Sequence, residues 1–137
     1  MAGKGPYELF KTDEDIENKG VSLNYGNFKI VVARAGGSNK KYLNLLEAKL
    51  RPYRRQIQTG TLDQETDVRV LAEVYAETVV LGWEGVTNED GESIPFTKPN
   101  IIKLLTELPD LFADLRAQAN NVSLFRSEDA REEDAKN

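Results

Sequence analysis

The chain has 137 residues, enough for one domain that buries about two thirds of the surface its unfolded chain would expose. It contains no cysteine and no histidine, which excludes disulfides, thiolate chemistry and the commonest general base and metal ligand. We therefore expect a protein that is not an enzyme and that binds neither a cofactor nor a metal. Its apolar runs are far shorter than the ~20 residues of a transmembrane helix, so we expect no membrane contact and a cytoplasmic location. Residues 1–6 have no apolar signal-peptide core and are expected to form a loose leader.

The net charge of −5 is unevenly distributed along the chain. Residues 34–58 contain seven basic side chains and one acidic side chain, a net +6, which leaves −11 for the remainder. A basic helix on an acidic body could meet an acidic partner or nucleic acid. A solvated charged face is the favoured interpretation, because acidic surroundings weaken the attraction to phosphate. Arg51, Arg54 and Arg55 beside Tyr53 keep a nucleic-acid-binding regulator as an alternative.

In chain order, the first predicted element is a β-hairpin over residues 21–32. Apolar and polar residues alternate on both sides of Gly26-Asn27, which predicts a two-residue turn with a positive φ at Gly26. A lone hairpin is marginal in water, so helices should cover its apolar face.

A helix is predicted after Gly36-Gly37, with Ser38 or Asn39 as its N-cap. Its apolar side chains recur at three- and four-residue steps and form one face, at Leu43, Leu46, Leu50, Tyr53 and Ile57. Pro52 cannot donate a backbone hydrogen bond to Ala48, so either a kink or a short break is expected near residues 49–51.

The next predicted helix is capped by Thr61 or Asp63 and should end near Trp83. It is apolar on more than one side, which indicates a central helix or one covered by a partner. Trp83 lies between glycines, where the backbone can bend sharply, and we expect its indole to pack in the core. Asp90-Gly91 then predicts the turn of a small surface hairpin.

Two further helices are predicted. Thr97 should cap the first, with Pro99 in its opening turn, and Pro109 should end it. The second begins at Pro109 and should reach about Phe125. The expected fold class is α+β, mainly α, with an N-terminal hairpin, about four helices and a small hairpin after Trp83. Residues 1–126 should form a single globular domain and 127–137 a flexible, disordered charged tail.

Three motifs with an apparent chemical meaning do not qualify as sites. Residues 35–41 lack the spacing of a phosphate loop. Residues 88–91 resemble the middle of a calcium loop, but Val86 and Thr97 would then stand at required ligand positions. Glu73 and Glu77, one helical turn apart, are ordinary exposed charges. No catalytic, cofactor or metal residue is assigned.

Residues 73–86 (EVYAETVVLGWEGV) are followed by Asp90-Gly91, Phe96-Thr97, Leu104-Leu105 and residues 108–111. Together these segments resemble the tail assembly chaperones of long-tailed, siphovirus-like bacteriophages. The resemblance implies a small, mainly helical, non-enzymatic protein that binds and solubilises the tape-measure protein in the host cytoplasm. It also implies a role in recruiting tail-tube subunits and absence from the mature virion.

Surplus apolar helix faces suit such a chaperone, because it must cover an apolar stripe on a helical partner. Leu111, Phe112 and Leu115 are the candidate contacts, although the same residues could belong to the core. Homo-oligomer formation is left open. The alternative function is that of a structural virion protein, either a tail-completion or a connector subunit, which would persist in purified particles.

A frameshift hypothesis concerns the last three residues, Ala135-Lys136-Asn137. The resemblance implies that a translating ribosome often slips back one base near the end of this reading frame and gives an extended form. The tripeptide can be encoded GCA-AAA-AAC, which contains the slippery run A-AAA-AAC in the required frame. The charged tail would then be a linker, whereas a chance Lys-Asn pair is the equally favoured alternative.

Overall fold

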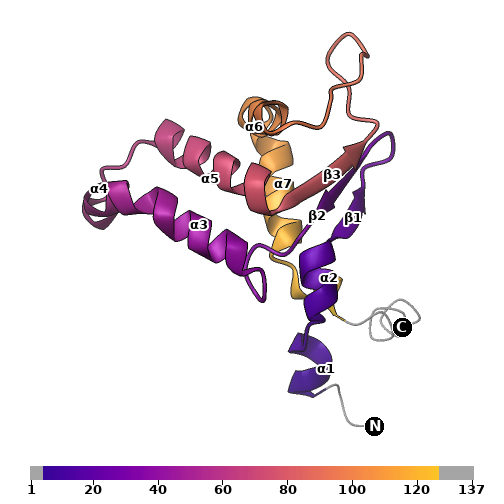
Figure 1. The fold of residues 1–137 in the computed structure, drawn as a ribbon, viewed down its shortest axis with the longest axis horizontal. Helices are drawn as coiled ribbons and strands as arrows, with labels where there is room; N and C mark the ends of the chain where they lie inside the picture. Colours follow the sequence, from indigo (N-terminus) through magenta and orange to yellow (C-terminus); the bar gives the residue numbers. More distant parts are fainter. Residues whose placement is uncertain (1–4, 127–137) are drawn as a thin grey trace.

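The computed structural model describes residues 5–126, and the charged tail predicted at 127–137 lies outside the described residues. Within this range the chain has the mainly helical α+β fold that the sequence predicts (Figure 1). A three-stranded antiparallel sheet packs against helices through one apolar core. The helical segment at residues 40–59 contributes no buried residue to that core.

The sheet has the strand order β1-β2-β3, with β1 at Val21–Asn24, β2 at Lys29–Val32 and β3 at Val80–Glu84. The predicted N-terminal hairpin is confirmed. Tyr25 donates its backbone N–H to the Phe28 carbonyl over 2.9 Å, and Gly26 has a φ of 97°. This conformation suits glycine because no Cβ is present.

The third strand corrects the expectation that the preceding helix ends near Trp83. Helix α5 covers Gln64–Thr78, and the chain then enters β3, in which Val80 pairs with Val32 and Trp83 with Ile30. Pairing with β2 supplies backbone partners that local periodicity does not reveal. Trp83 is half-buried at the sheet edge, where its Nε1 donates to the Ile94 carbonyl over 3.0 Å.

Helix α5 is central, which is one of the two arrangements expected for a helix that is apolar on more than one side. Asp63 caps it by accepting a hydrogen bond from the Thr66 backbone N–H at 3.0 Å. Tyr75, 1% exposed, lies in the middle of the core, with its ring edge-on to Tyr42 at 5.8 Å and to Phe112 at 5.3 Å between centroids. Burial of the phenol raises the pKa of Tyr75 above its ordinary value.

Two helices complete the body: α6 at Lys98–Glu107 and α7 at Pro109–Ala119. Thr97 caps α6 as predicted, accepting from the Asn100 N–H at 3.3 Å. Helix α7 ends earlier than expected, and a 3-10 turn, η2, follows at Val122–Phe125. The small hairpin after Trp83 consists of a turn with one bridge, between Thr87 and Ser93.

Two short helices precede the sheet: α1 at Pro6–Phe10 and α2 at Glu14–Lys19. Glu17 of α2 is 1% exposed. Its carboxylate pairs with Arg34 at 3.0 Å and accepts from the Ser38 backbone N–H at 3.1 Å and the Ser38 hydroxyl at 2.8 Å. Burial disfavours the charge, but these hydrogen bonds and Arg34 outweigh burial, so the pKa of Glu17 lies below its ordinary value.

The segment after the glycine pair forms an arm, which we define as residues 40–59. It consists of α3 at Lys40–Leu50, the 3-10 turn η1 at Arg51–Tyr53 and α4 at Arg54–Thr59. Pro52 therefore breaks the helix, one of the two outcomes expected for it. Asn39 is the N-cap of α3, but its side-chain amide donates instead to the carbonyls of Arg34 and Thr78.

Candidate partner-binding surface

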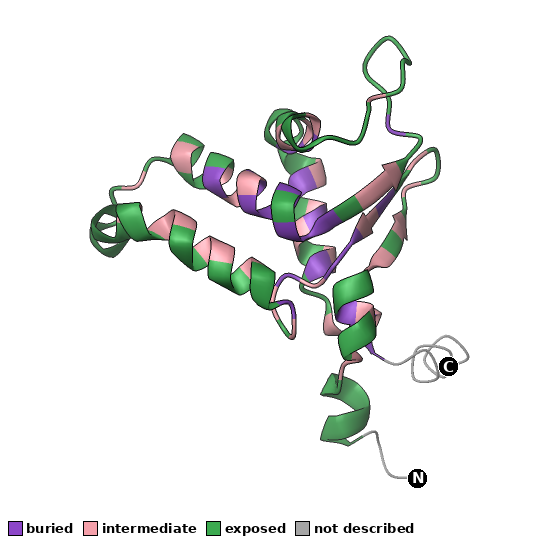
Figure 2. Cartoon of the chain, viewed as in Figure 1, coloured by how far each residue is buried: buried purple, intermediate pink, exposed green. Residues whose placement is uncertain are grey.

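The arm packs on one side of α5 and carries no buried residue in α3, η1 or α4. Figure 2 shows α3 and α4 in the colours of exposed and intermediate residues, whereas the facing helix α5 carries several buried positions. Lys49 joins the arm to α5 through an ion pair with Glu73 at 3.1 Å. Because none of its residues is buried, part of the apolar face of this amphipathic segment remains in contact with solvent.

The apolar row of the arm consists of Leu43, Leu46, Leu50 and Ile57. Leu43 is 47% exposed and Ile57 46% exposed, while Leu46 and Leu50 are half-buried. Leu50 and Ile57 line a shallow hollow of about 240 Å³. A second hollow, of about 360 Å³, lies between Ile57 and the turn that follows α4. The row therefore offers a partner both exposed apolar area and hollows into which its side chains can fit.

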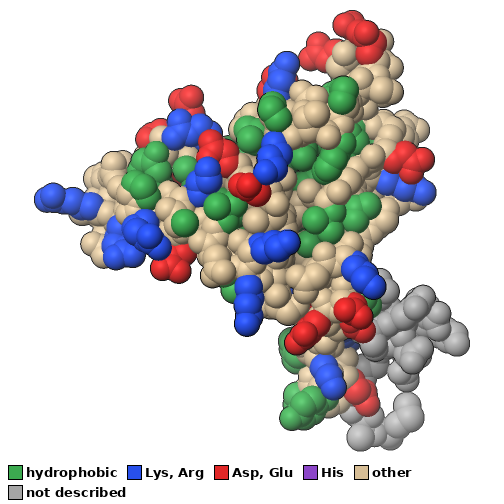
Figure 3. All heavy atoms as spheres, in the orientation of Figure 1, with side chains coloured by type: hydrophobic (Ala, Val, Ile, Leu, Met, Phe, Trp, Pro, Cys, Tyr) green, Lys and Arg blue, Asp and Glu red, His purple; other side chains and the backbone are tan. Residues whose placement is uncertain are grey.

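Basic side chains surround the far end of this row. Arg51 and Arg54 line the same hollow as Leu50 and Ile57. Arg51 lies 3.8 Å from Glu47, whereas Arg54 and Arg55 form no ion pair with any other residue of the range 5–126. In Figure 3 the Lys and Arg side chains gather over the end of the arm. The surface is therefore apolar along its row and positively charged at its tip.

The three contacts that the sequence predicts lie elsewhere, on α7. Phe112 is 2% exposed and Leu115 is fully buried, while Leu111 is half-buried against the same core. The Arg116 guanidinium covers the Phe112 ring at 4.7 Å. Phe112 and Leu115 are enclosed by the core and Leu111 lies partly within it, so we do not carry these three residues into the proposed site. Helical periodicity identified an apolar face but not what covers it.

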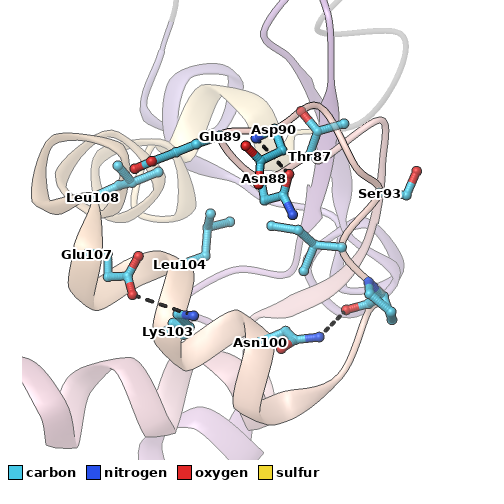
Figure 4. Close-up of a pocket in the computed structure, with 12 residues that line it drawn as sticks. Thr87, Asn88, Glu89, Asp90, Ser93, Asn100, Lys103, Leu104, Glu107 and Leu108 are labelled. Carbon is cyan, nitrogen blue, oxygen red and sulfur yellow. Dashed lines mark hydrogen bonds and ion pairs between the residues drawn. The ribbon is translucent and has the colours of Figure 1, made fainter.

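A second concave surface lies on the opposite side of α5, between α6 and the connection from β3 to α6. This cleft has a volume of about 530 Å³. Figure 4 shows Leu104 of α6 and Leu108, the residue between α6 and α7, facing the turn that carries Asn88, Glu89 and Asp90. Asn88 fixes the turn, because its side-chain oxygen accepts the backbone N–H groups of Asp90 and Glu92, both at 2.9 Å.

The glycine pair at 36–37 serves the fold. The backbone N–H of Ser38, which a phosphate loop would offer to a ligand, is already donated to Glu17. A Cβ at Gly37 would collide with the Glu17 carboxylate, and Gly37 has a φ of 55°. Both observations explain glycine at this position by the close approach of α2. This agrees with the rejection of a phosphate loop on spacing.

Metal binding and membrane spanning would each require a recognisable feature within residues 5–126. In that range no group of three or more acidic side chains is arranged to hold a metal ion. Nor does the same range contain a helix that is both long and apolar enough to cross a membrane. The concave and apolar surfaces of the arm and the cleft are thus the features that call for a functional explanation.

Residues 37–137 match the family described as YdaY prophage protein, which is most of the chain and includes the arm, α5, β3, α6 and α7. No curated protein and no solved structure matches the chain. The chain belongs to the YdaY prophage protein family.

Proposed function

We propose that this prophage protein is a non-enzymatic tail assembly chaperone that binds and solubilises the tape-measure protein through the apolar row of its arm. The observation that carries the proposal is the exposure of Leu43 on α3 and of Ile57 on α4, two helices of the arm that contain no buried residue. The origin in a prophage and the resemblance of residues 73–86 to tail assembly chaperones support the same function.

The chemistry of the row suits a helical partner. Leu43, Leu46 and Leu50 follow the three- and four-residue spacing by which one helix packs on another. A tape-measure protein awaiting assembly would cover the row with its own apolar stripe. The chaperone would act in the host cytoplasm and leave before the virion matures. An extended form, made by the frameshift hypothesised at Lys136-Asn137, would recruit the tail-tube protein.

Co-expression with the tape-measure protein of the same prophage tests this function. The intact chain should keep the tape-measure protein in the soluble fraction, and the Leu43→Asp/Ile57→Asp variant should lose at least half of that effect, because both substitutions place charge in the apolar row. Circular dichroism should show an unchanged fold, since both side chains are about half exposed.

Tyr7→Asp is the matched control, because Tyr7 is a large, exposed apolar side chain on α1, outside the arm. It should solubilise the tape-measure protein as well as the unchanged chain does. Equal activity of all three proteins would remove the arm from the proposal. Recovery of the chain in purified particles would instead favour the structural alternative, a tail-completion or connector subunit.

A further inference from the structure

The cleft beside α6 combines an apolar floor with an acidic rim. Its floor is formed by Ile94, Leu104 and Leu108, of which Leu108 is 48% exposed. Glu89 and Asp90 lie on its rim and form no ion pair with another residue of the range 5–126. The two remaining charges of the lining, Lys103 and Glu107, face each other at 3.9 Å (Figure 4). The net charge of the lining is therefore negative.

The end of the arm has the converse properties. Ile57 stands between two hollows and is 46% exposed, and Arg54 and Arg55 of the same short helix have no acidic partner within the range 5–126. One protruding apolar side chain with two neighbouring guanidinium groups matches an apolar floor with two neighbouring carboxylates. Arginine is well suited to this role, because its planar fork can form paired hydrogen bonds with a carboxylate.

The two surfaces lie on different sides of the molecule, which matters for how copies could meet. In Figures 1 and 3 the end of the arm and the turn at 88–91 project in different directions. The arm of a chain therefore cannot reach the cleft of the same chain, but it can reach that of another. A contact between two different surfaces leaves one arm and one cleft unused at the ends, so it can continue from copy to copy.

We propose that the protein associates head to tail, with the arm end of one copy docked in the cleft of the next. Ile57 enters the apolar floor, and Arg54 and Arg55 face Glu89 and Asp90. The contact involves few residues and would bury less than the ~1,000 Å² of a stable interface, so it forms at high protein concentration and dissociates readily. Because the opposite charges lie at an exposed rim, high salt screens their attraction and weakens the contact.

The docked arm also uses Ile57, which belongs to the apolar row proposed to bind the tape-measure protein. On the basis of that proposed function, self-association and partner binding compete for Ile57. Head-to-tail association itself does not depend on the tape-measure protein, so the two proposals can fail separately.

Sedimentation velocity of the purified chain over a concentration series tests the association. The mean mass of the unchanged protein should rise with concentration at ~50 mM salt and fall back toward one chain at ~500 mM salt. Ile57→Asp should remove the association from the arm side, and Glu89→Lys/Asp90→Lys should remove it from the cleft side. Glu14→Lys/Asp15→Lys, a charge reversal on α2, is the control and should associate like the unchanged protein.

Mixing the two non-associating variants distinguishes head-to-tail contact from a two-fold dimer. The Ile57→Asp copy keeps an intact cleft, and the Glu89→Lys/Asp90→Lys copy keeps an intact arm. One productive contact remains between them, so the mixture should form a complex of two chains and stop there. Circular dichroism should show that each variant is folded.

Three results would overturn the proposal. The first is an unchanged protein that stays a single chain at every concentration. The second is association that survives either variant. The third is a mixture of the folded variants that remains as single chains. None of these results would bear on solubilisation of the tape-measure protein, which is measured separately.

Discussion

Two helical regions of this chain carry apolar residues at the same spacing and have opposite surroundings. On α7, Phe112 and Leu115 are enclosed by the core, whereas on the arm Leu43 and Ile57 remain about half exposed. Both regions are amphipathic, so periodicity alone does not tell a core face from a binding face. The difference arises from the neighbours: α7 meets Tyr75 and the sheet, while the arm packs only along one side of α5.

The largest expected effect on stability comes from a substitution in the core. Phe112→Ala should lower the free energy of unfolding by about 3–5 kcal/mol, because it removes buried area and leaves a cavity beside Tyr75. Ile57→Ala, the matched change on the arm, should lower it by about 1 kcal/mol or less. Urea unfolding of the two variants measures the difference. Similar losses would mean that the arm is packed as tightly as the core.

A smaller effect is expected at Glu17, which fixes the loop where the arm joins the body. Glu17→Ala leaves Arg34 and Ser38 without their partner and should lower the free energy of unfolding by about 2–3 kcal/mol. Thermal unfolding at neutral pH measures it. Ser38 and Arg34 also make the stability of the fold depend on pH, because they lower the pKa of the Glu17 carboxyl in the folded state.

The sign of that pH dependence follows from the direction of the shift. The pKa of Glu17 is lower in the folded chain than its ordinary value of 4.5, so the ionised carboxylate stabilises the fold fully above that value. This stabilisation should be lost as the pH falls through the folded-state pKa. Glu17→Gln should therefore lose less stability than the unchanged protein between about pH 5 and pH 2. Parallel acid unfolding curves would contradict the assignment.

The smallest expected effect lies at the ion pair between the arm and α5. Lys49 and Glu73 are both about one third exposed, so solvent screens their attraction. A double-mutant cycle with Lys49→Ala and Glu73→Ala should give a coupling energy below about 1 kcal/mol. A much larger coupling would show that electrostatics, rather than apolar packing on α5, holds the arm in place.

Local chemistry made a large part of the fold predictable. The turn at Gly26-Asn27 and the caps at Asp63 and Thr97 were all predicted, because each depends on a few adjacent residues. The break at Pro52 follows equally from a missing backbone donor.

The remaining features depend on residues far apart in sequence. Val80–Glu84 continues an apolar helical pattern, but its backbone pairs with β2, about fifty residues earlier. The burial of Phe112 and Leu115 on α7 depends on distant residues in the same way, because it comes from Tyr75 and its neighbours on other elements. The basic charge of residues 34–58 around an apolar row was a signal for the arm, although no local rule showed that the row is exposed.

Hydrogen–deuterium exchange of the chain with and without its tape-measure protein tests most directly whether the arm is the binding surface. The account predicts that the partner slows exchange in residues 40–59 and leaves 109–119 as slow as in the isolated chain, because that helix is already enclosed by the core. A stable complex in which the arm exchanges at its original rate, with new protection elsewhere, would contradict it.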